Sequence, residues 1–95
     1  MSITTLLNHK VQFSCGAYGY VITWEVNGVE ARFLHSRNIS FYTSFDSITQ
    51  YENSTLLITA SLTHNNSELT CVLGIHGGRE VARMSAFLRI QGNTH

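Results

Sequence analysis

The residues of this sequence best suited to covalent chemistry are its two cysteines, Cys15 and Cys71. Each lies in a short stretch, Val-Gln-Phe-Ser-Cys and Ser-Glu-Leu-Thr-Cys-Val-Leu, that alternates small or apolar side chains with polar ones. Such alternation is typical of β-strands with one buried face. Either the two thiols form the single intrachain disulfide that two cysteines allow, or both stay reduced in the core. A disulfide closing a loop of this length would stabilise the fold by about 4 kcal/mol in the chain-entropy account.

Asparagine-linked glycosylation is the second chemistry that the sequence allows. Three sequons of the form Asn-x-Ser/Thr begin at Asn38, Asn53 and Asn65. We expect all three to lie in turns or at strand edges, where an acceptor asparagine is accessible. Three sequons in so short a chain favour an oxidising, secretory context, in which the disulfide would form.

Metal binding and catalysis find little support in the residue pattern. None of the five histidines has a second ligand-type residue at a recognised metal spacing, and each falls in a predicted turn or at the terminus. The single aspartate is Asp46, the glutamates are scattered, and no nucleophile elbow or phosphate-binding glycine loop is present. We therefore expect no cofactor, no metal and no enzymatic activity. The histidines are His9, His35, His64, His76 and His95.

The length and net charge of the chain limit the number of domains and the classes of binding partner. Ninety-five residues suit one domain, spanning residues 1–95. Six basic and six acidic residues give a formal net charge of zero, which argues against binding to nucleic acid. No apolar run approaches the ~20 residues that span a bilayer, and the N-terminus lacks the basic start and apolar centre of a signal peptide. We expect a fragment of a larger extracellular protein that does not itself insert into a membrane.

The elements that must position these residues are predicted to be strands alone. Alternating stretches bounded by turn residues indicate strands over residues 2–7, 10–15, 21–26, 29–34, 55–62, 68–75 and 81–90. Residues 39–51 lack a clean period, and we expect one or two short edge strands there. Asn27-Gly28 predicts a tight hairpin turn, because a type I′ turn needs positive φ at both central residues. Within these strands, Trp24, Leu69 and Leu88 are predicted core residues.

The whole pattern resembles an immunoglobulin superfamily domain of the I-set or compact V-set type. The resemblance rests on the strand ending in Cys15, the strand around Trp24, Leu56-Leu57-Ile58-Thr59, Leu69-Thr70-Cys71, and residues 86–92. It implies an all-β, two-sheet antiparallel Greek-key sandwich with a Cys15–Cys71 inter-sheet disulfide. The chain departs from the family in carrying Leu69 where a corner tyrosine is frequent, and in its short spacing between Cys15 and Trp24.

In this family, binding usually occurs on the outer face of the sheet formed by strands G, F, C and C′, or on the loops. If Cys71, Trp24 and Leu88 point into the core, the alternation of each strand points six candidate interface residues outward. Val72 and Phe87 are expected to form an exposed apolar centre within a charged rim, the composition of an interface. The alternative is that Phe87 packs under the N-terminal segment or a loop. The six residues are Thr23, Glu25, Val72, Arg83, Phe87 and Arg89.

The loops are the second candidate surface. Tyr18, Tyr20, His76 and Arg79 combine tyrosines with neighbouring glycines, as antibody paratopes do. The alternative for Tyr20 is that it covers the end of the core. A further aromatic group, Phe41, Tyr42 and Phe45, is expected to be partly buried.

The expected function is extracellular recognition or adhesion by a cell-surface receptor, in self/non-self recognition or cell adhesion. The partner would be a protein on another cell or another copy of the chain, and a two-fold homodimer is the first expectation. The alternatives are a structural spacer in a tandem array, a soluble immune-type domain that binds its ligand through its loops, and an intracellular muscle-type module with reduced cysteines.

Overall fold

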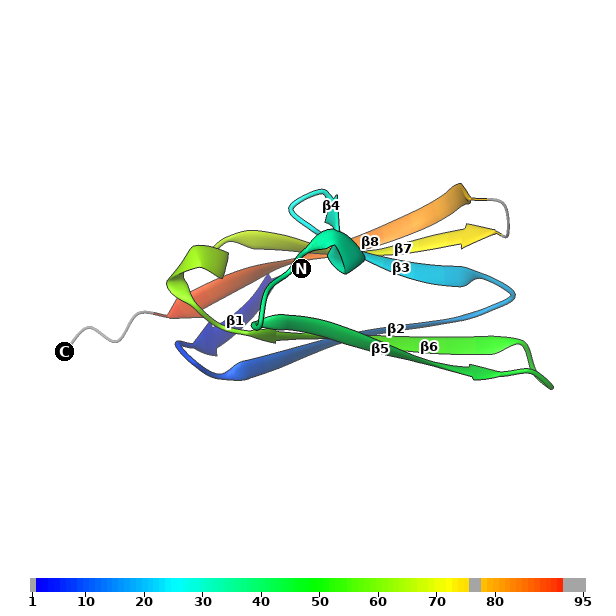
Figure 1. The fold of residues 1–95 in the computed structure, drawn as a ribbon, viewed down its shortest axis with the longest axis horizontal. Coiled ribbons are helices and arrows are strands. Elements are labelled where there is room, and N and C mark those ends of the chain that lie inside the picture. Colours follow the sequence, from blue (N-terminus) through cyan, green and yellow to red (C-terminus); the bar gives the residue numbers. More distant parts are fainter. Residues whose placement is uncertain (1, 76–77, 92–95) are drawn as a thin grey trace.

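The computed structural model describes residues 2–75 and 78–91, which form eight strands and two short 3-10 helices (Figure 1). The strands follow one another along the chain, and no α-helix occurs in the described residues. The strands are β1 (Ser2–Leu6), β2 (Lys10–Tyr18), β3 (Val21–Val26), β4 (Val29–Glu30), β5 (Ile39–Asp46), β6 (Tyr51–Thr59), β7 (Ser67–Ile75) and β8 (Arg79–Gln91). The helices are η1 (Ala31–Phe33) and η2 (Leu62–His64).

The strands form two layers that face each other in Figure 1. One sheet has the order β1-β8-β7-β3-β4, and the other has the order β2-β6-β5. All strand pairs are antiparallel except β1 and β8, which are parallel. The predicted all-β, immunoglobulin-like sandwich is therefore confirmed, with a parallel edge strand added to it.

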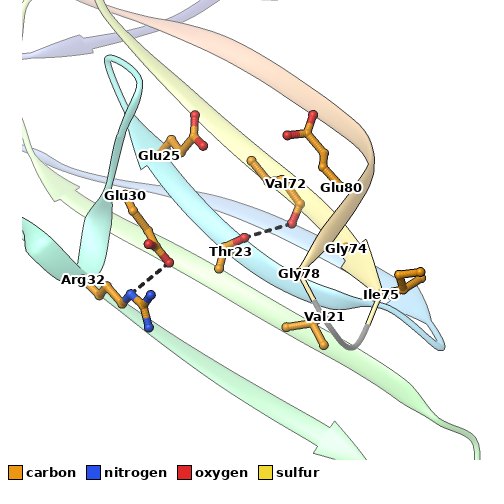
Figure 2. A pocket seen from close by; sticks show the side chains of 10 residues that line it. All are labelled: Val21, Thr23, Glu25, Glu30, Arg32, Val72, Gly74, Ile75, Gly78 and Glu80. Carbon is orange, nitrogen blue, oxygen red and sulfur yellow. Dashed lines mark hydrogen bonds and ion pairs between the residues drawn. The ribbon is translucent and has the colours of Figure 1, made fainter.

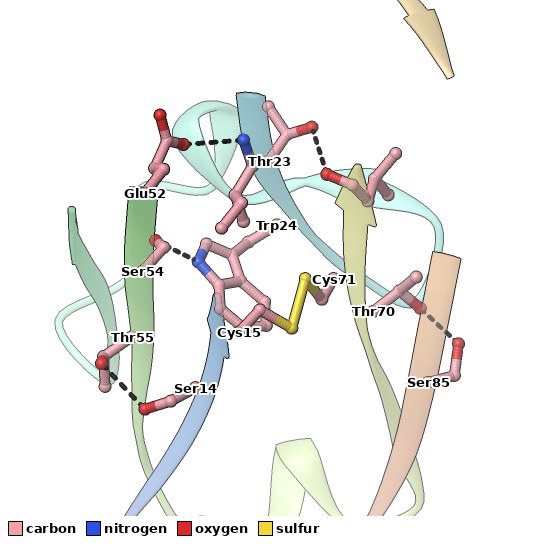
Figure 3. Close-up of a disulfide and its surroundings, with 12 residues drawn as sticks. Ser14, Cys15, Thr23, Trp24, Glu52, Ser54, Thr55, Thr70, Cys71 and Ser85 are labelled. Carbon is pink, nitrogen blue, oxygen red and sulfur yellow. Dashed lines mark hydrogen bonds between the residues drawn. A yellow bond between two sulfur atoms is a disulfide. The ribbon is translucent and has the colours of Figure 1, made fainter. Parts of the chain in front are cut away.

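The predicted disulfide is present and joins the two sheets. Cys15 on β2 is bonded to Cys71 on β7, with the Cα atoms 6.6 Å apart (Figure 3). Trp24, Leu69 and Leu88 are all at most 1% exposed, which confirms them as core residues. The disulfide and this apolar layer lie between the sheets because alternation sends every second side chain of each strand inward.

The indole of Trp24 has a polar partner in the core. Its Nε1–H donates to Ser54 Oγ on β6 at 2.8 Å (Figure 3). Ser54 Oγ also donates to the backbone carbonyl of Tyr42 and lies 2.9 Å from the hydroxyl of Thr43. Because an unpaired buried N–H is costly, this serine offsets the penalty of burying the indole N–H.

The Asn27-Gly28 hairpin is confirmed, but the strand that follows is shorter than predicted. Asn27 and Gly28 have φ values of 53° and 83°, as a type I′ turn requires. The predicted strand over residues 29–34 is wrong after Glu30, because the chain enters η1 there. This turn places Ala31 in the core with only 4% of its surface exposed.

Other boundaries also shift. Residues 39–46 form one long strand, so the expectation of one or two short strands is met by a single element. The strand predicted over residues 55–62 lies at 51–59, and β2 runs on to Tyr18. No helix in the described residues has the length and apolarity to cross a membrane.

Candidate functional site

The candidate site is the outer face of the five-stranded sheet, the face turned away from β2, β6 and β5. Register places its residues in rows across β3, β7 and β8. Thr23, Val72 and Arg83 form one row. Glu25 lies in the next row with Thr70 and Ser85, whose hydroxyl groups are 2.9 Å apart. The predicted outward orientation of the strands is therefore correct here.

A hollow of about 540 Å³ lies on this face (Figure 2). Its floor comes from β3 and β7, and its sides come from β4, η1 and the start of β8. Apolar side chains contribute to its lining beside three carboxylates and one guanidinium group. The lining residues are Val21, Thr23, Glu25, Glu30, Arg32, Val72, Gly74, Ile75, Gly78 and Glu80.

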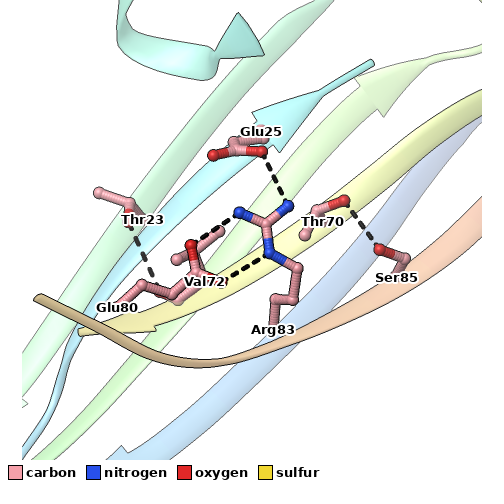
Figure 4. A network of polar contacts seen from close by, with 7 residues as sticks. All are labelled: Thr23, Glu25, Thr70, Val72, Glu80, Arg83 and Ser85. Carbon is pink, nitrogen blue, oxygen red and sulfur yellow. Dashed lines mark hydrogen bonds and ion pairs between the residues drawn. The ribbon is translucent and has the colours of Figure 1, made fainter. Parts of the chain in front are cut away.

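Arg83 contacts two of the carboxylates at the charged edge of the hollow. Its Nε and Nη2 groups donate to the two carboxylate oxygens of Glu80, each at 2.7 Å, and its Nη1 lies 3.5 Å from Glu25 Oε1 (Figure 4). Such a fork-like pair fixes geometry as well as charge. The hydrogen bond from Arg83 lowers the pKa of Glu80 below its ordinary value of 4.5, and the same pair raises the pKa of Arg83.

A β-bulge explains how Glu80 reaches Arg83. In a regular strand, residues three apart point to opposite faces. The pairing of β7 with β8 shifts register between Leu73 and Gly74, so that Gly74 pairs with Glu80 whereas Leu73 pairs with Ala82. The shift turns Glu80 to the same face as Arg83. Sequence alternation alone did not identify Glu80.

Two further charges of this face were not predicted from the sequence. Glu30 pairs directly with Glu25 across β3 and β4, and like charges in this position repel each other. Arg32 offsets this repulsion, because its Nε lies 3.1 Å from Glu30 Oε1. The Asn27-Gly28 turn was a usable signal for Glu30, since a two-residue hairpin places residue 30 opposite residue 25. No sequence signal indicated Arg32, which lies on η1.

The expected apolar centre of Val72 and Phe87 does not form. Val72 is only 7% exposed, because it lies within a row between Thr23 and Arg83 under the Arg83 network. Phe87 is 43% exposed and pairs with Glu68 and Ser2, two rows further along the sheet. Arg89 lies beyond it, beside Thr4 of β1. Of the six predicted interface residues, the structure brings together Thr23, Glu25, Val72 and Arg83.

The loop candidates are only partly assembled. Tyr20 is 39% exposed and lines a hollow of about 270 Å³ with Phe45 and Glu52. Tyr18 is 66% exposed and its ring packs against that of Tyr51 in a tilted arrangement, with ring centroids 4.7 Å apart. Arg79 is exposed at the start of β8, and the predicted loop residue His76 lies outside the described residues.

The remaining aromatic group departs from expectation. Phe41, Tyr42 and Phe45 expose 42%, 54% and 55% of their surface, so the prediction that some of them are buried is wrong. They lie on β5, where Phe41 and Phe45 face the opposite sheet, which offers no strand to cover them once β4 ends at Glu30. Tyr42 lies between them and points away from that sheet.

The sequons divide into two kinds. Asn38 and Asn65 lie in turns, as predicted. Asn53 instead lies within β6, the central strand of its sheet, where it pairs with Gly16 and Ser44. Alternation points it away from the core, since Ser54 points inward to Trp24.

The described residues hold no group of three or more histidine, cysteine, aspartate or glutamate side chains arranged to bind a metal ion. The outer face combines an apolar floor with charges that are already paired and oriented.

Comparison with known proteins gives information on the fold and none on the function. The sequence matches no protein-family model and no curated protein. The fold is similar to a solved structure titled "Crystal Structure of Rst D1-D2", with a TM-score of 0.64 and 16% sequence identity. The similarity covers 95% of this chain and 44% of that chain, so the chain spans less than half of its length. At this identity the likeness concerns the fold alone.

Proposed function

We propose that this chain is an extracellular recognition domain of the immunoglobulin superfamily, which binds a protein partner through the outer face of its five-stranded sheet. The Cys15–Cys71 disulfide supports an oxidising location, and the three sequons support a secreted or cell-surface protein. The similar solved structure bears a title with two domains, D1-D2. This agrees with a role for the chain as one domain of a longer ectodomain.

The observation that carries the proposal is the hollow of about 540 Å³ beside the Arg83 network. An interface needs an apolar area from which water is displaced on binding. It also needs polar groups that are already in position before binding. Val21 and Ile75 supply apolar surface, while Glu80 and Glu25 hold Arg83 in place before any partner arrives. Binding would then cost little side-chain entropy.

Homophilic adhesion is the form of recognition that we propose first. The chain has no net charge, and its outer face presents both signs, so that two copies related by a two-fold axis could pair unlike charges. Phe87 would extend the contact towards β1, where it is 43% exposed.

Sedimentation velocity over a wide concentration range tests this proposal. Phe87→Arg places a charge at an exposed apolar position of the face, and Ile75→Arg places one at the rim of the hollow. We expect each to weaken self-association without lowering the melting temperature. Tyr18→Arg, at an exposed position of the other sheet, is the matched control. An unchanged association constant in both variants would exclude this face as the homophilic site. A strict monomer would favour a different protein partner, or the structural spacer.

A further inference from the structure

Strand β5 (Ile39–Asp46) is a sheet edge with both faces open. Among the described strands it pairs with β6 alone, on one side of the three-stranded sheet. Every residue of the strand after Ile39 is exposed. Phe41 lines a small hollow with Trp24, and Phe45 lines another with Tyr20, so both phenylalanines point towards the gap beside β3.

Alternate backbone N–H and C=O groups of β5 do not pair with β6. The backbone N–H of Thr59 donates to the carbonyl of Asn38 at 2.7 Å, which makes this a hydrogen-bonded pair of the antiparallel ladder. Because such pairs alternate with non-bonded ones, the even-numbered residues of β5 bond to β6. The N–H and C=O groups of Phe41, Thr43 and Phe45 therefore point away from the sheet.

None of the usual protections of an edge strand is present along β5. The segment from Ile39 to Phe45 carries no charged residue, and the whole chain contains no proline. The pairing of β5 with β6 has no bulge that would twist the edge away. Exposed, uncharged and flat edges of this kind pair readily with another strand.

The ends of the strand indicate which strand it would pair with. Arg37 precedes β5, and Asp46 ends it. In an antiparallel pair of two identical strands, the beginning of one lies beside the end of the other. Arg37 of each copy would thus lie near Asp46 of its partner, while the uncharged residues between them would face one another.

We propose that β5 pairs with β5 of a second copy, so that the two three-stranded sheets join into one six-stranded sheet. This contact is separate from the outer face of the proposed function. The free N–H groups of β5 belong to Phe41, Thr43 and Phe45, because the N–H of Ile39 donates to the carbonyl of Ser36. Two registers place odd-numbered residues opposite each other along nearly the whole strand. The one that also brings Arg37 beside Asp46 pairs Phe41 with Thr43 and Ile39 with Phe45. The two-fold axis then passes between the two Tyr42 residues, which lie directly opposite each other.

The two-fold axis allows a charge-swap test at Tyr42. The protein is produced without N-linked glycans, because Asn38 adjoins the strand, and it carries Phe87→Arg and Ile75→Arg to remove association through the outer face. Sedimentation equilibrium of this background should show a weak dimer, since an edge contact is smaller than a standard interface. Tyr42→Lys alone and Tyr42→Glu alone each place like charges in direct opposition, and each should weaken dimerisation by about tenfold or more.

Mixing the two variants restores opposite charges at the axis. The mixture should therefore form a heterodimer about as tightly as the parent protein forms its dimer. Tyr18→Lys, an exposed tyrosine on the opposite edge strand of the same sheet, should leave the dimer unchanged. A parent protein that stays monomeric at every concentration would overturn the proposal. A dimer insensitive to both Tyr42 substitutions, or a mixture that fails to associate, would overturn it as well.

Discussion

Trp24 and Ser54 link the two sheets through a buried hydrogen bond of 2.8 Å, from the indole Nε1–H to the serine Oγ. Trp24 is 1% exposed and Ser54 is 0% exposed, so neither group can reach water. The pair lies beside the Cys15–Cys71 bond in Figure 3. Two connections, one polar and one covalent, therefore hold the sandwich together near its centre.

Replacement of Ser54 by alanine should destabilise the domain by about 1–3 kcal/mol, because the indole N–H would remain buried without an acceptor. The measurement is the free energy of unfolding in urea. Ser44→Ala is the control, since Ser44 is exposed on the neighbouring strand β5. Equal losses in the two variants would show that the hydrogen bond to Trp24 contributes nothing of its own.

Removal of the disulfide by the double substitution Cys15→Ala and Cys71→Ala should lower the free energy of unfolding by about 4 kcal/mol. The cysteines are 56 positions apart, so the bond closes a long loop in the unfolded chain. Denaturation of the wild-type protein with and without a reductant should reproduce most of this loss. A reduced protein as stable as the oxidised one would contradict the prediction.

The ion pair of Glu80 and Arg83 should make a pH-dependent contribution to stability. The pKa of Glu80 is lower in the folded protein than its ordinary value of 4.5, so this contribution is present above that value. It is lost as the pH falls through the lower pKa of the folded state. The melting temperatures of wild type and Glu80→Gln should thus differ at neutral pH and converge in acid. A difference that persists unchanged in acid would exclude the ionised carboxylate as its source.

Gly16 leaves room for the side chain of Tyr51. A Cβ at position 16 would overlap the Tyr51 hydroxyl group, and the ring of Tyr51 packs against that of Tyr18. Gly16→Ala should therefore cost about 1 kcal/mol, as the ring is forced out of its place. In a double-mutant cycle with Tyr51→Ala, the loss caused by Gly16→Ala should largely disappear. Additive losses would show that Tyr51 is not the residue that excludes a side chain at position 16.

Much of the sandwich could be predicted from the sequence because its determinants are local. Alternation around Cys15, Trp24 and Cys71 is a property of each strand by itself, and the Asn27-Gly28 turn needs only two residues with positive φ. Both faces of β3 and most of β7 therefore follow from the order of their residues alone. The same alternation turned Thr23, Glu25 and Arg83 to the outer face.

The tertiary structure decided which side chains of each face are buried by neighbouring strands and which stay exposed. Val72 points outward as predicted but is buried by its neighbours, and Phe41 points inward but is exposed because β4 ends at Glu30. Glu80 joins the outer face only through the register shift at Leu73 and Gly74. Coverage depends on how far strands distant in the sequence extend, and a bulge depends on how two strands pair. The periodicity within a single strand carries no information on how far distant strands extend or on how two strands pair.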